Sequence, residues 1–251
     1  MNIVQSFYDS MAASYDKLFA DWKATTHEQA LILDQLFRDY GFDRQARILD
    51  CACGIGTQAI GVGALGYTVT ATDISEGELA EARLRAAEQG VEVFFACADF
   101  RGLESVVTDT YDVVMAMDNA LPHMLSHEDL ASAVGSITGR LASNGIFVAS
   151  IRDYDALRET KPSYSPPYIH QTAQGQRVCF QTWHWEGDIY RLTQYIIEDG
   201  DSLEISKFDC AYRATQRQEL TELLLECGCR EVEWKFPQET GFYQPIVVAR
   251  K

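Results

Sequence analysis

The stretch DCACGIG, residues 50–56, contains two kinds of residue that could carry chemistry. Cys51 and Cys53 are thiols two positions apart, and such a pair could bind a metal ion or take part in redox chemistry. Gly54 and Gly56 have no Cβ, so the backbone there can turn sharply and come close to a ligand. The two alternatives require different surroundings, and the predicted elements on either side of the stretch decide between them.

Strands and helices are predicted to alternate around this stretch. Short apolar runs predict buried strands at residues 46–52, 67–73, 91–100, 111–120 and 146–155, with closing strands at 230–236 and 242–251. Helical segments lie between them at residues 57–66, 74–90 and 126–143, and Asn144–Gly145 predicts a turn. The predicted fold class is therefore α/β, a Rossmann-like, doubly wound sheet of seven mostly parallel strands.

The pattern divides the chain into three regions. Residues 1–45 are helical and rich in aromatic side chains, and they form a candidate N-terminal lid. Residues 46–160 and 214–251 form the α/β core. Residues 161–213 alternate apolar with polar positions between Gly-Asp turns. This alternation predicts an antiparallel meander that is inserted into the core and contributes to the substrate pocket.

The composition limits the partners. The 251 residues carry a formal net charge of −16, and because a surface that binds nucleic acid must be basic, no nucleic-acid partner is expected. No run approaches the roughly 18 apolar residues of a membrane span. The first residues lack the pattern of a secretory signal, so seven scattered cysteines indicate reduced thiols and a cytoplasmic location. We expect a small-molecule ligand, with a monomer or a homo-oligomer left open.

Three predicted strands end in residues suited to a nucleoside ligand. Gly54 and Gly56 follow the first strand and precede a helix, where open α/β sheets bind ligands. Asp73 ends the second strand, and a carboxylate there can accept hydrogen bonds from both hydroxyls of a ribose. Asp99 ends the third strand, where it could meet an adenine amino group.

Two ligands fit such an arrangement. Dinucleotide sites usually have a third glycine, which lets the helix pack closely and hold a pyrophosphate at its N-terminus. Ala59 occupies that position here, and Asp50 would repel a pyrophosphate but attract the ammonium end of an amino acid. The loop therefore favours S-adenosylmethionine over NAD.

Residues 46–150 resemble the class I S-adenosylmethionine-dependent methyltransferases. The motifs are LDCACGIG, TATDIS, ACADF and YDVVMAMDNALPHM, in the order and spacing of that family. The resemblance implies S-adenosylmethionine as the cofactor and S-adenosylhomocysteine as the product. It also implies a cofactor pocket formed by Asp50, Ala52, Cys53, Gly54, Asp73, Ile74, Asp99, Phe100, Met117 and His123, with Tyr15 and Trp22 from the candidate lid.

Core packing then becomes the expected role of the cysteines. Cys51 and Cys53 lie two apart in a predicted strand, so both side chains are expected on one face of the sheet. No second cysteine pair has zinc-finger spacing and no histidine cluster completes a site, so no metal is expected. SPPY, residues 165–168, is similar to a base-binding run of DNA amino-methyltransferases. It follows the fifth strand and not the fourth, so we interpret it as a loop whose Tyr168 faces the pocket.

Arg152 is the residue whose type and position suggest what the methyl acceptor is. It ends the fifth predicted strand, where its guanidinium could bind a carboxylate through two parallel hydrogen bonds or could pair with Asp153 or Asp155. The pattern R-x-Y-D, the spacing from Asn119 to His123 in NALPHM, and the meander resemble the glycine and sarcosine N-methyltransferases.

That resemblance implies the roles of the acceptor site. An arginine at this point of the family holds the carboxylate of the amino acid, which implies this role for Arg152. Asn119 would then border the acceptor amine, and Tyr195 and Tyr243 would surround the transferred methyl group. Tyr15 and Trp22 would belong to the lid.

The sequence thus predicts methyl transfer to the amine of a small amino acid such as glycine or sarcosine. Because a neutral amine is already a nucleophile, the enzyme mainly has to orient it and exclude water, and no strong base is expected. Two alternatives stay open. One is a methyltransferase for another small metabolite with a nitrogen or oxygen acceptor. The other is a non-catalytic protein that binds the cofactor.

Overall fold

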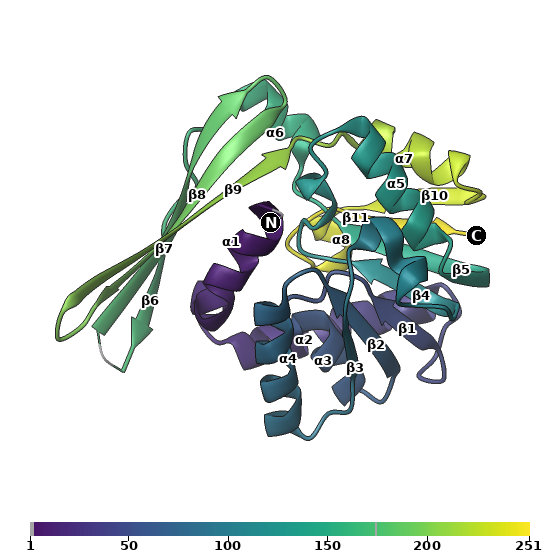
Figure 1. The fold of residues 1–251 in the computed structure, drawn as a ribbon, viewed down its shortest axis with the longest axis horizontal. Coiled ribbons are helices and arrows are strands. Elements are labelled where there is room, and N and C mark those ends of the chain that lie inside the picture. Colours follow the sequence, from purple (N-terminus) through teal and green to yellow (C-terminus); the bar gives the residue numbers. More distant parts are fainter. Residues whose placement is uncertain (1–2, 174) are drawn as a thin grey trace.

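The computed structural model describes residues 3–173 and 175–251. Its larger sheet, sheet A, has seven strands in the order β10-β11-β5-β4-β1-β2-β3 (Figure 1). The five strands from β5 to β3 in this order are parallel, whereas β11 runs antiparallel to β5 and β10 antiparallel to β11. The predicted fold class is confirmed. The strands are β1 (Arg47–Asp50), β2 (Thr68–Asp73), β3 (Phe94–Cys97), β4 (Tyr111–Ala116), β5 (Leu141–Ser150), β10 (Glu231–Lys235) and β11 (Ile246–Arg250).

Helices cover both faces of sheet A. One face packs against α2 (Trp22–Asp39), α3 (Thr57–Ala64) and α4 (Glu76–Gln89), and the other against η2 (Phe100–Ser105), α5 (His127–Thr138) and α7 (Arg217–Glu226). Short connections are formed by η3 (Leu121–His123), α6 (Tyr154–Thr160) and α8 (Pro237–Thr240). Within residues 3–173 and 175–251, no helix is both long and apolar enough to cross a lipid bilayer.

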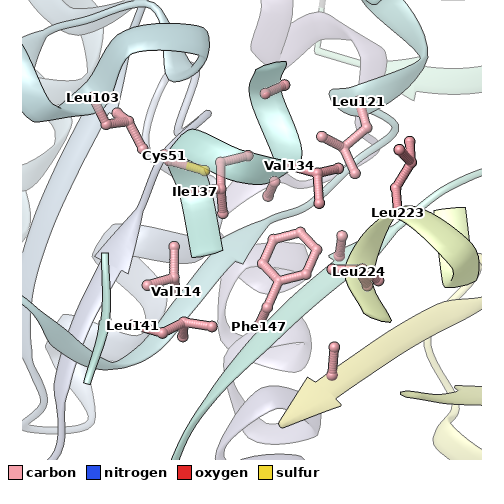
Figure 2. Packing of buried hydrophobic residues seen from close by; sticks show 14 of the residues in the cluster. Cys51, Leu103, Val114, Leu121, Val134, Ile137, Leu141, Phe147, Leu223 and Leu224 are labelled. Atoms are coloured by element: carbon pink, nitrogen blue, oxygen red, sulfur yellow. The ribbon is translucent and has the colours of Figure 1, made fainter. Parts of the chain in front are cut away.

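The core between sheet A and α5 and α7 is shown from close by in Figure 2. The ring of Phe147 on β5 lies among side chains of β4, α5 and α7, represented by Val114, Val134 and Leu224. These four side chains have at most 1 % of their surface exposed. Burial of this kind supplies most of the stability of an α/β domain, and it fixes the strand ends in space.

A glycine allows α3 to approach α2 closely. A Cβ added at Gly61 would lie 2.7 Å from the carbonyl oxygen of Thr26 and 3.0 Å from Cβ of Ala30. Trp22, the first residue of α2, donates a hydrogen bond of 2.9 Å from Nε1 to Oγ1 of Thr57, the first residue of α3. The two contacts fix the position of α3, which begins directly after the DCACGIG loop.

The predicted boundaries around the fifth strand were wrong. The helix expected to run to residue 143 ends at Thr138, and β5 begins at Leu141. Asn144–Gly145 lies inside β5 and does not separate it from the helix. Asn144 adopts a φ of +65°, and the register jumps there from Tyr111↔Leu141 to Val113↔Ile146, which is a bulge. A bulge and a turn use the same residue types, so the sequence could not distinguish them.

The predicted meander is present as sheet B. Its strands β6 (Tyr168–Thr172), β7 (Gly175–Glu186), β8 (Ile189–Asp199) and β9 (Leu203–Arg213) are antiparallel neighbours in chain order. Side chains alternate between its two faces. The inner face, with Tyr190 on β8 and Tyr212 on β9, packs on α1 (Ile3–Met11) through Phe7 and Met11. Figure 1 shows α1 between sheet B and the α/β core, followed by η1 (Ala12–Leu18).

Phe147→Ala should lower the free energy of unfolding by about 3–5 kcal/mol, because it leaves a cavity in a core without access to water. Urea unfolding followed by circular dichroism measures the loss. Leu84→Ala is the control: Leu84 is 60 % exposed on α4, so its truncation should cost less than about 1 kcal/mol. Equal losses for the two variants would contradict the packing of Phe147.

Candidate functional site

The carboxyl ends of β1, β2 and β4 meet around one cavity. The strand order reverses between β1 and β4, so the loops after these strands diverge and leave a crevice. α1 and η1, near the N-terminus of the chain, cover the cavity. The cavity wall contains ten of the residues predicted to bind a cofactor: Tyr15, Ala52, Cys53, Gly54, Asp73, Ile74, Asp99, Phe100, Met117 and His123.

The loop after β1 is held against the end of β2. Gly54 and Gly56 have φ angles of +51° and +90°, which favour glycine. The Gly54 N–H donates to Oδ2 of Asp73 at 2.8 Å, and the Cys53 N–H donates to the carbonyl of Thr72 at 3.0 Å. Because Gly54 has no side chain, the backbone of the turn itself lines the cavity.

Asp73 links the two strand ends. Its Oδ2 accepts from Gly54, and its Oδ1 accepts from the Ser75 N–H at 2.9 Å. Each carboxylate oxygen can accept a further hydrogen bond. Burial raises the pKa of Asp73, although the hydrogen bonds from the loop work against that shift. A carboxylate with this geometry suits a pair of neighbouring hydroxyls.

Two of the predicted cofactor residues lie outside the cavity wall. Asp50 is fully buried at the end of β1, beneath the loop, where Oδ1 accepts from the Ala52 N–H at 3.3 Å and Oδ2 has no partner among the described residues. Trp22 packs against Ile55 and α3 and bonds to Thr57. Both residues were predicted to contact the ligand. The side chain of Asp50, the last residue of β1, is buried in the protein and does not face the cavity, and Trp22 packs against α3.

The carboxylate of Asp99, which follows the third strand, has a partner that the sequence did not predict. Asp99 lines the cavity, but its carboxylate forms an ion pair with Arg101, with the shortest N–O distance 2.6 Å. Arg101 also reaches Asp129 at 2.9 Å. Phe100, next to Asp99, lines the same part of the cavity and offers an apolar face to a planar ring.

Aromatic side chains close the cavity on the side of sheet B. The Tyr8 hydroxyl lies 2.8 Å from Nε2 of His123, and the His123 ring lies 4.2 Å from the Tyr212 ring, centroid to centroid. Burial lowers the pKa of His123 to about 3, so this imidazole is neutral at physiological pH. Burial also raises the pKa values of Tyr8 and Tyr15 well above 10, so both remain neutral phenols.

Arg152 lies behind this aromatic wall. Its guanidinium donates to the Tyr190 hydroxyl at 2.7 Å and to Oε1 of Gln181 at 3.0 Å, and it lies 5.0 Å from the centre of the Trp183 ring and 5.6 Å from that of Tyr212. The expected alternative partners, Asp153 and Asp155, pair with Arg217 instead. Within the described residues, Arg152 has no carboxylate at salt-bridge distance.

Asn119 connects Arg152 to the cavity. Its Oδ1 accepts from the Arg152 backbone N–H at 3.1 Å and from the Tyr154 hydroxyl at 3.0 Å. Its Nδ2 is buried without a partner in the described parts of the chain. The preceding residue, Asp118, lines the cavity, and both residues adopt left-handed backbone with φ of +55° and +69°. Strained backbone of this kind is often found at functional sites.

The predicted tyrosines separate into two groups. Tyr243 reaches the site, because its hydroxyl donates to Oδ1 of Asp118 at 2.8 Å. Tyr195 does not, because it lies on the outer face of sheet B and stacks on Phe180 at 4.9 Å. Tyr190 on the same strand faces inward and binds Arg152. Tyr168 begins β6, is 61 % exposed and lies outside the cavity wall.

The cysteines pack in the core, but on different sides. Cys51 belongs to the cluster with α5 and α7, and Cys53 to the cluster with α2 and α3. The expectation that both point to one face was wrong because β1 ends at Asp50, and alternation applies only within a strand.

Comparison with known proteins identifies the domain. A family model described as a methyltransferase domain matches residues 48–145, which include the loop, Asp73, Asp99 and His123. The chain contains a class I, S-adenosylmethionine-dependent methyltransferase domain. The predicted family and cofactor are therefore confirmed. Among solved structures, the CcbJ methyltransferase from Streptomyces caelestis has a TM-score of 0.77 at 17 % identity, over 100 % of this chain and 99 % of that one.

Curated relatives of this methyltransferase domain act on different acceptors. A glycine/sarcosine N-methyltransferase from Parasynechococcus marenigrum (strain WH8102) is 26 % identical over 155 residues, which are 62 % of this chain but only 54 % of that protein. One from Halorhodospira halochloris is 22 % identical over 229 residues, 91 % of this chain and 81 % of that one. A ubiquinone biosynthesis O-methyltransferase from Aeromonas salmonicida (strain A449) is 30 % identical over 146 residues, 57 % and 59 % of the two chains.

The site fits S-adenosylmethionine. The turn at Gly54 is a cradle, since a Cβ there would lie 3.3 Å from Oε2 of the buried Glu78. Asp73 has acceptor capacity for a ribose, and Phe100 offers a flat apolar surface. The neutral His123 adds no positive charge beside the sulfonium, while the carboxylate of Asp118 favours a cation.

The cavity wall also contains Tyr8, Gln58 and Asp118, which the predicted set of cofactor-binding residues did not include. Tyr8 lies in an aromatic segment without clear periodicity, and its position depends on how α1 packs on sheet B. Gln58 is the second residue of α3, and its Nε2 is shared between Oε1 of Gln29 at 2.6 Å and Oδ2 of Asp118 at 2.8 Å. Asp118 precedes the predicted Asn119, and an acid directly after an apolar run was the signal that could have revealed it.

Asp50→Asn should remove a pH-dependent loss of stability from the free protein. Burial raises the pKa of Asp50 to about 8, so the folded protein retains a proton that the unfolded chain releases near pH 4. Its contribution to stability is full below about pH 4 and is lost as the pH rises to about 8, by up to about 1.4 kcal/mol per unit. Urea unfolding at pH 4 to 9 measures the slope, with the exposed Asp109→Asn as the control. Identical slopes for wild type and Asp50→Asn would contradict the buried, protonated state.

Proposed function

We propose that this protein transfers a methyl group from S-adenosylmethionine to the amine of a small amino acid such as glycine or sarcosine. The observation that carries the proposal is the partly buried guanidinium of Arg152, which has no carboxylate partner in the described part of the chain. A buried charge is costly unless it is paired. The carboxylate of an amino acid would supply the missing charge.

The contacts of Arg152 favour a fixed orientation. Tyr190 and Gln181 each occupy one N–H of the guanidinium, and the rings of Trp183 and Tyr212 lie beside it. A guanidinium has five N–H donors, so three are left for a ligand. The planar fork suits the two oxygens of a carboxylate.

The remaining residues of the site would orient the acceptor. S-adenosylmethionine, when bound, supplies a methyl group on positively charged sulfur that a neutral amine can attack directly. The aromatic side chains of Tyr8 and Tyr15 line the cavity, where they would displace water, and their neutral hydroxyl oxygens would favour the positive charge shared during the transfer. Positioning of this kind can supply several kcal/mol of the reduction in the barrier.

An oxygen acceptor is the second candidate. It is supported by the 30 % identity with the ubiquinone biosynthesis O-methyltransferase. A hydroxyl acceptor would need a base to remove its proton, and the low pKa of about 3 makes His123 a weak one. Methyl transfer to amino acids and to phenolic acids, compared in parallel, separates the two candidates.

Arg152→Met should raise KM for glycine and sarcosine by about 100-fold or more, because charge-assisted hydrogen bonds to the carboxylate are lost. Affinity for S-adenosylmethionine should change by less than about threefold, since Arg152 is not in the cavity wall. Formation of S-adenosylhomocysteine measures the rate. Arg158→Met is the matched control, because Arg158 forms only an exposed ion pair with Asp188. Absence of turnover of both amino acids by wild type would refute the proposal.

Asp73→Asn should weaken binding of S-adenosylmethionine by about tenfold or more, because one acceptor oxygen for the ribose is replaced by a donor. Isothermal titration calorimetry measures the affinity. The variant Asp43→Asn, on the exposed segment before β1, should bind as wild type does. If the affinity of Asp73→Asn equals that of wild type, the assigned role of Asp73 is incorrect.

A further inference from the structure

Asp118 is a carboxylate in the cavity wall without a cation beside it. Its Oδ1 accepts from the Tyr243 hydroxyl at 2.8 Å, and its Oδ2 accepts from Nε2 of Gln58 at 2.8 Å. Both donors are neutral, and among residues 3–173 and 175–251 no lysine, arginine or histidine forms an ion pair with it. Two hydrogen bonds therefore stabilise the carboxylate, but no positive charge neutralises it. Each of its oxygens can accept a further hydrogen bond.

The backbone around Asp118 is held in a strained form. Asp118 and Asn119 both have positive φ, which costs of order 1 kcal/mol for each residue with a Cβ. Ser150 at the end of β5 retains this turn: its Oγ accepts from the Asp118 N–H at 2.8 Å, and its carbonyl accepts from the Asn119 N–H at 3.0 Å. Ser150 Oγ in turn donates to Oε1 of Gln244 at 2.9 Å. The two strand ends thus fix the side chain of Asp118 in the cavity wall.

The same turn links the two segments of the chain that carry these charges of opposite sign. Asp118 lines the cavity, and Asn119, the next residue, accepts a hydrogen bond from the backbone of Arg152. Neither Asp118 nor Arg152 has an ionic partner in the described residues. A small amino acid carries one ammonium and one carboxylate, so its two charges match both.

We propose that Asp118 binds the ammonium group of the acceptor and removes one proton from it, while Arg152 binds the carboxylate. This inference rests on the proposed function. In the proton step, one N–H bond of the ammonium breaks, its electron pair stays on nitrogen, and an O–H bond forms on Asp118. The neutral amine then has the lone pair that attacks the methyl carbon. The protonated Asp118 later loses its proton to water.

The surroundings of Asp118 suit this step. Burial raises the pKa of Asp118, which makes it a stronger base than an exposed carboxylate, although Gln58 and Tyr243 work against the shift. The ionisable groups that face it are Asp50 from β1, Tyr15 from η1, and Tyr243 from the segment before β11. All three are acids that are neutral when protonated, and burial raises the pKa of each, so none provides a competing cation.

A pair of ligands of the same shape tests the ammonium contact. Sarcosine carries an ammonium where methoxyacetate carries an uncharged ether oxygen, and both have the carboxylate. With S-adenosylhomocysteine present, wild type should bind sarcosine about tenfold or more tightly than methoxyacetate, as measured by calorimetry. Asp118→Asn should reduce this preference to about twofold or less. Arg152→Met should weaken both ligands while keeping the preference.

Asp118→Asn is suited to the test because asparagine adopts positive φ readily. Asp118→Gly, which also accepts this backbone, is the second neutral variant, and a thermal melt verifies folding of both. Asp109→Asn is the control, because Asp109 lies just before β4, at the opposite end of that strand, in an exposed ion pair. It should keep the wild-type preference for sarcosine.

The pH profile of kcat/KM tests the proton step separately. Without Asp118 only the small fraction of free amine reacts, so kcat/KM of Asp118→Asn should rise about tenfold per pH unit up to the pKa of the amine. Wild type should level off at lower pH. An unchanged sarcosine preference in Asp118→Asn, or identical profiles, would refute the role of Asp118 while leaving methyl transfer intact. If wild type neither binds nor methylates sarcosine or glycine, the proposed function itself is refuted.

Discussion

The hydrogen bond from the Gly54 N–H to Asp73 is the contact on which the rest of the site depends. It joins the loop after β1 to the end of β2, and it is possible only because Gly54 adopts a left-handed backbone. The same carboxylate also accepts from the Ser75 N–H, where α4 is about to begin. One side chain therefore sets the distance between the turn, the second strand and the next helix, and the turn and the end of the second strand form part of the cavity wall.

The opposite side of the site is built by sheet B and α1. Inward-facing residues of β8 and β9 pack on α1, and the Tyr8–His123–Tyr212 contacts continue this packing to the edge of the cavity. Arg152 lies beyond these rings and belongs to the segment after β5. The cavity is therefore bounded by the α/β core on one side and by α1 and η1 on the other, and sheet B supports α1 and His123 from behind.

The parts of the site that could be predicted are those determined by local sequence. A glycine turn after an apolar strand and an acid at the end of the next strand have one structural meaning, and the structure places Gly54 and Asp73 together. Asp99 could also be placed at its strand end, but not its ion pair with Arg101, because sequence does not show which acceptors a neighbouring cation occupies.

The positions of other residues depend on which face of a strand they occupy and on tertiary packing. Tyr195 and Tyr190 are on one strand, and only the direction of side-chain alternation decides that Tyr190 faces Arg152. Cys51 and Cys53 separate to two cores because the strand ends two residues earlier than its apolar run suggests. The position of Asp118 depends on a strained turn held by Ser150 from another strand, a contact that no local pattern reveals.

Gly61 does not contact the ligand loop, but its lack of a side chain affects the position of that loop. It lets the backbone of α2 lie against α3, and the Trp22–Thr57 bond joins the ends of the same two helices, next to the turn after β1. Any larger residue at 61 would act as a wedge and push the helices apart, and the displacement would be carried to Thr57 and the turn. The dimensions of the ligand loop are thus set in part by the spacing of two helix axes behind it.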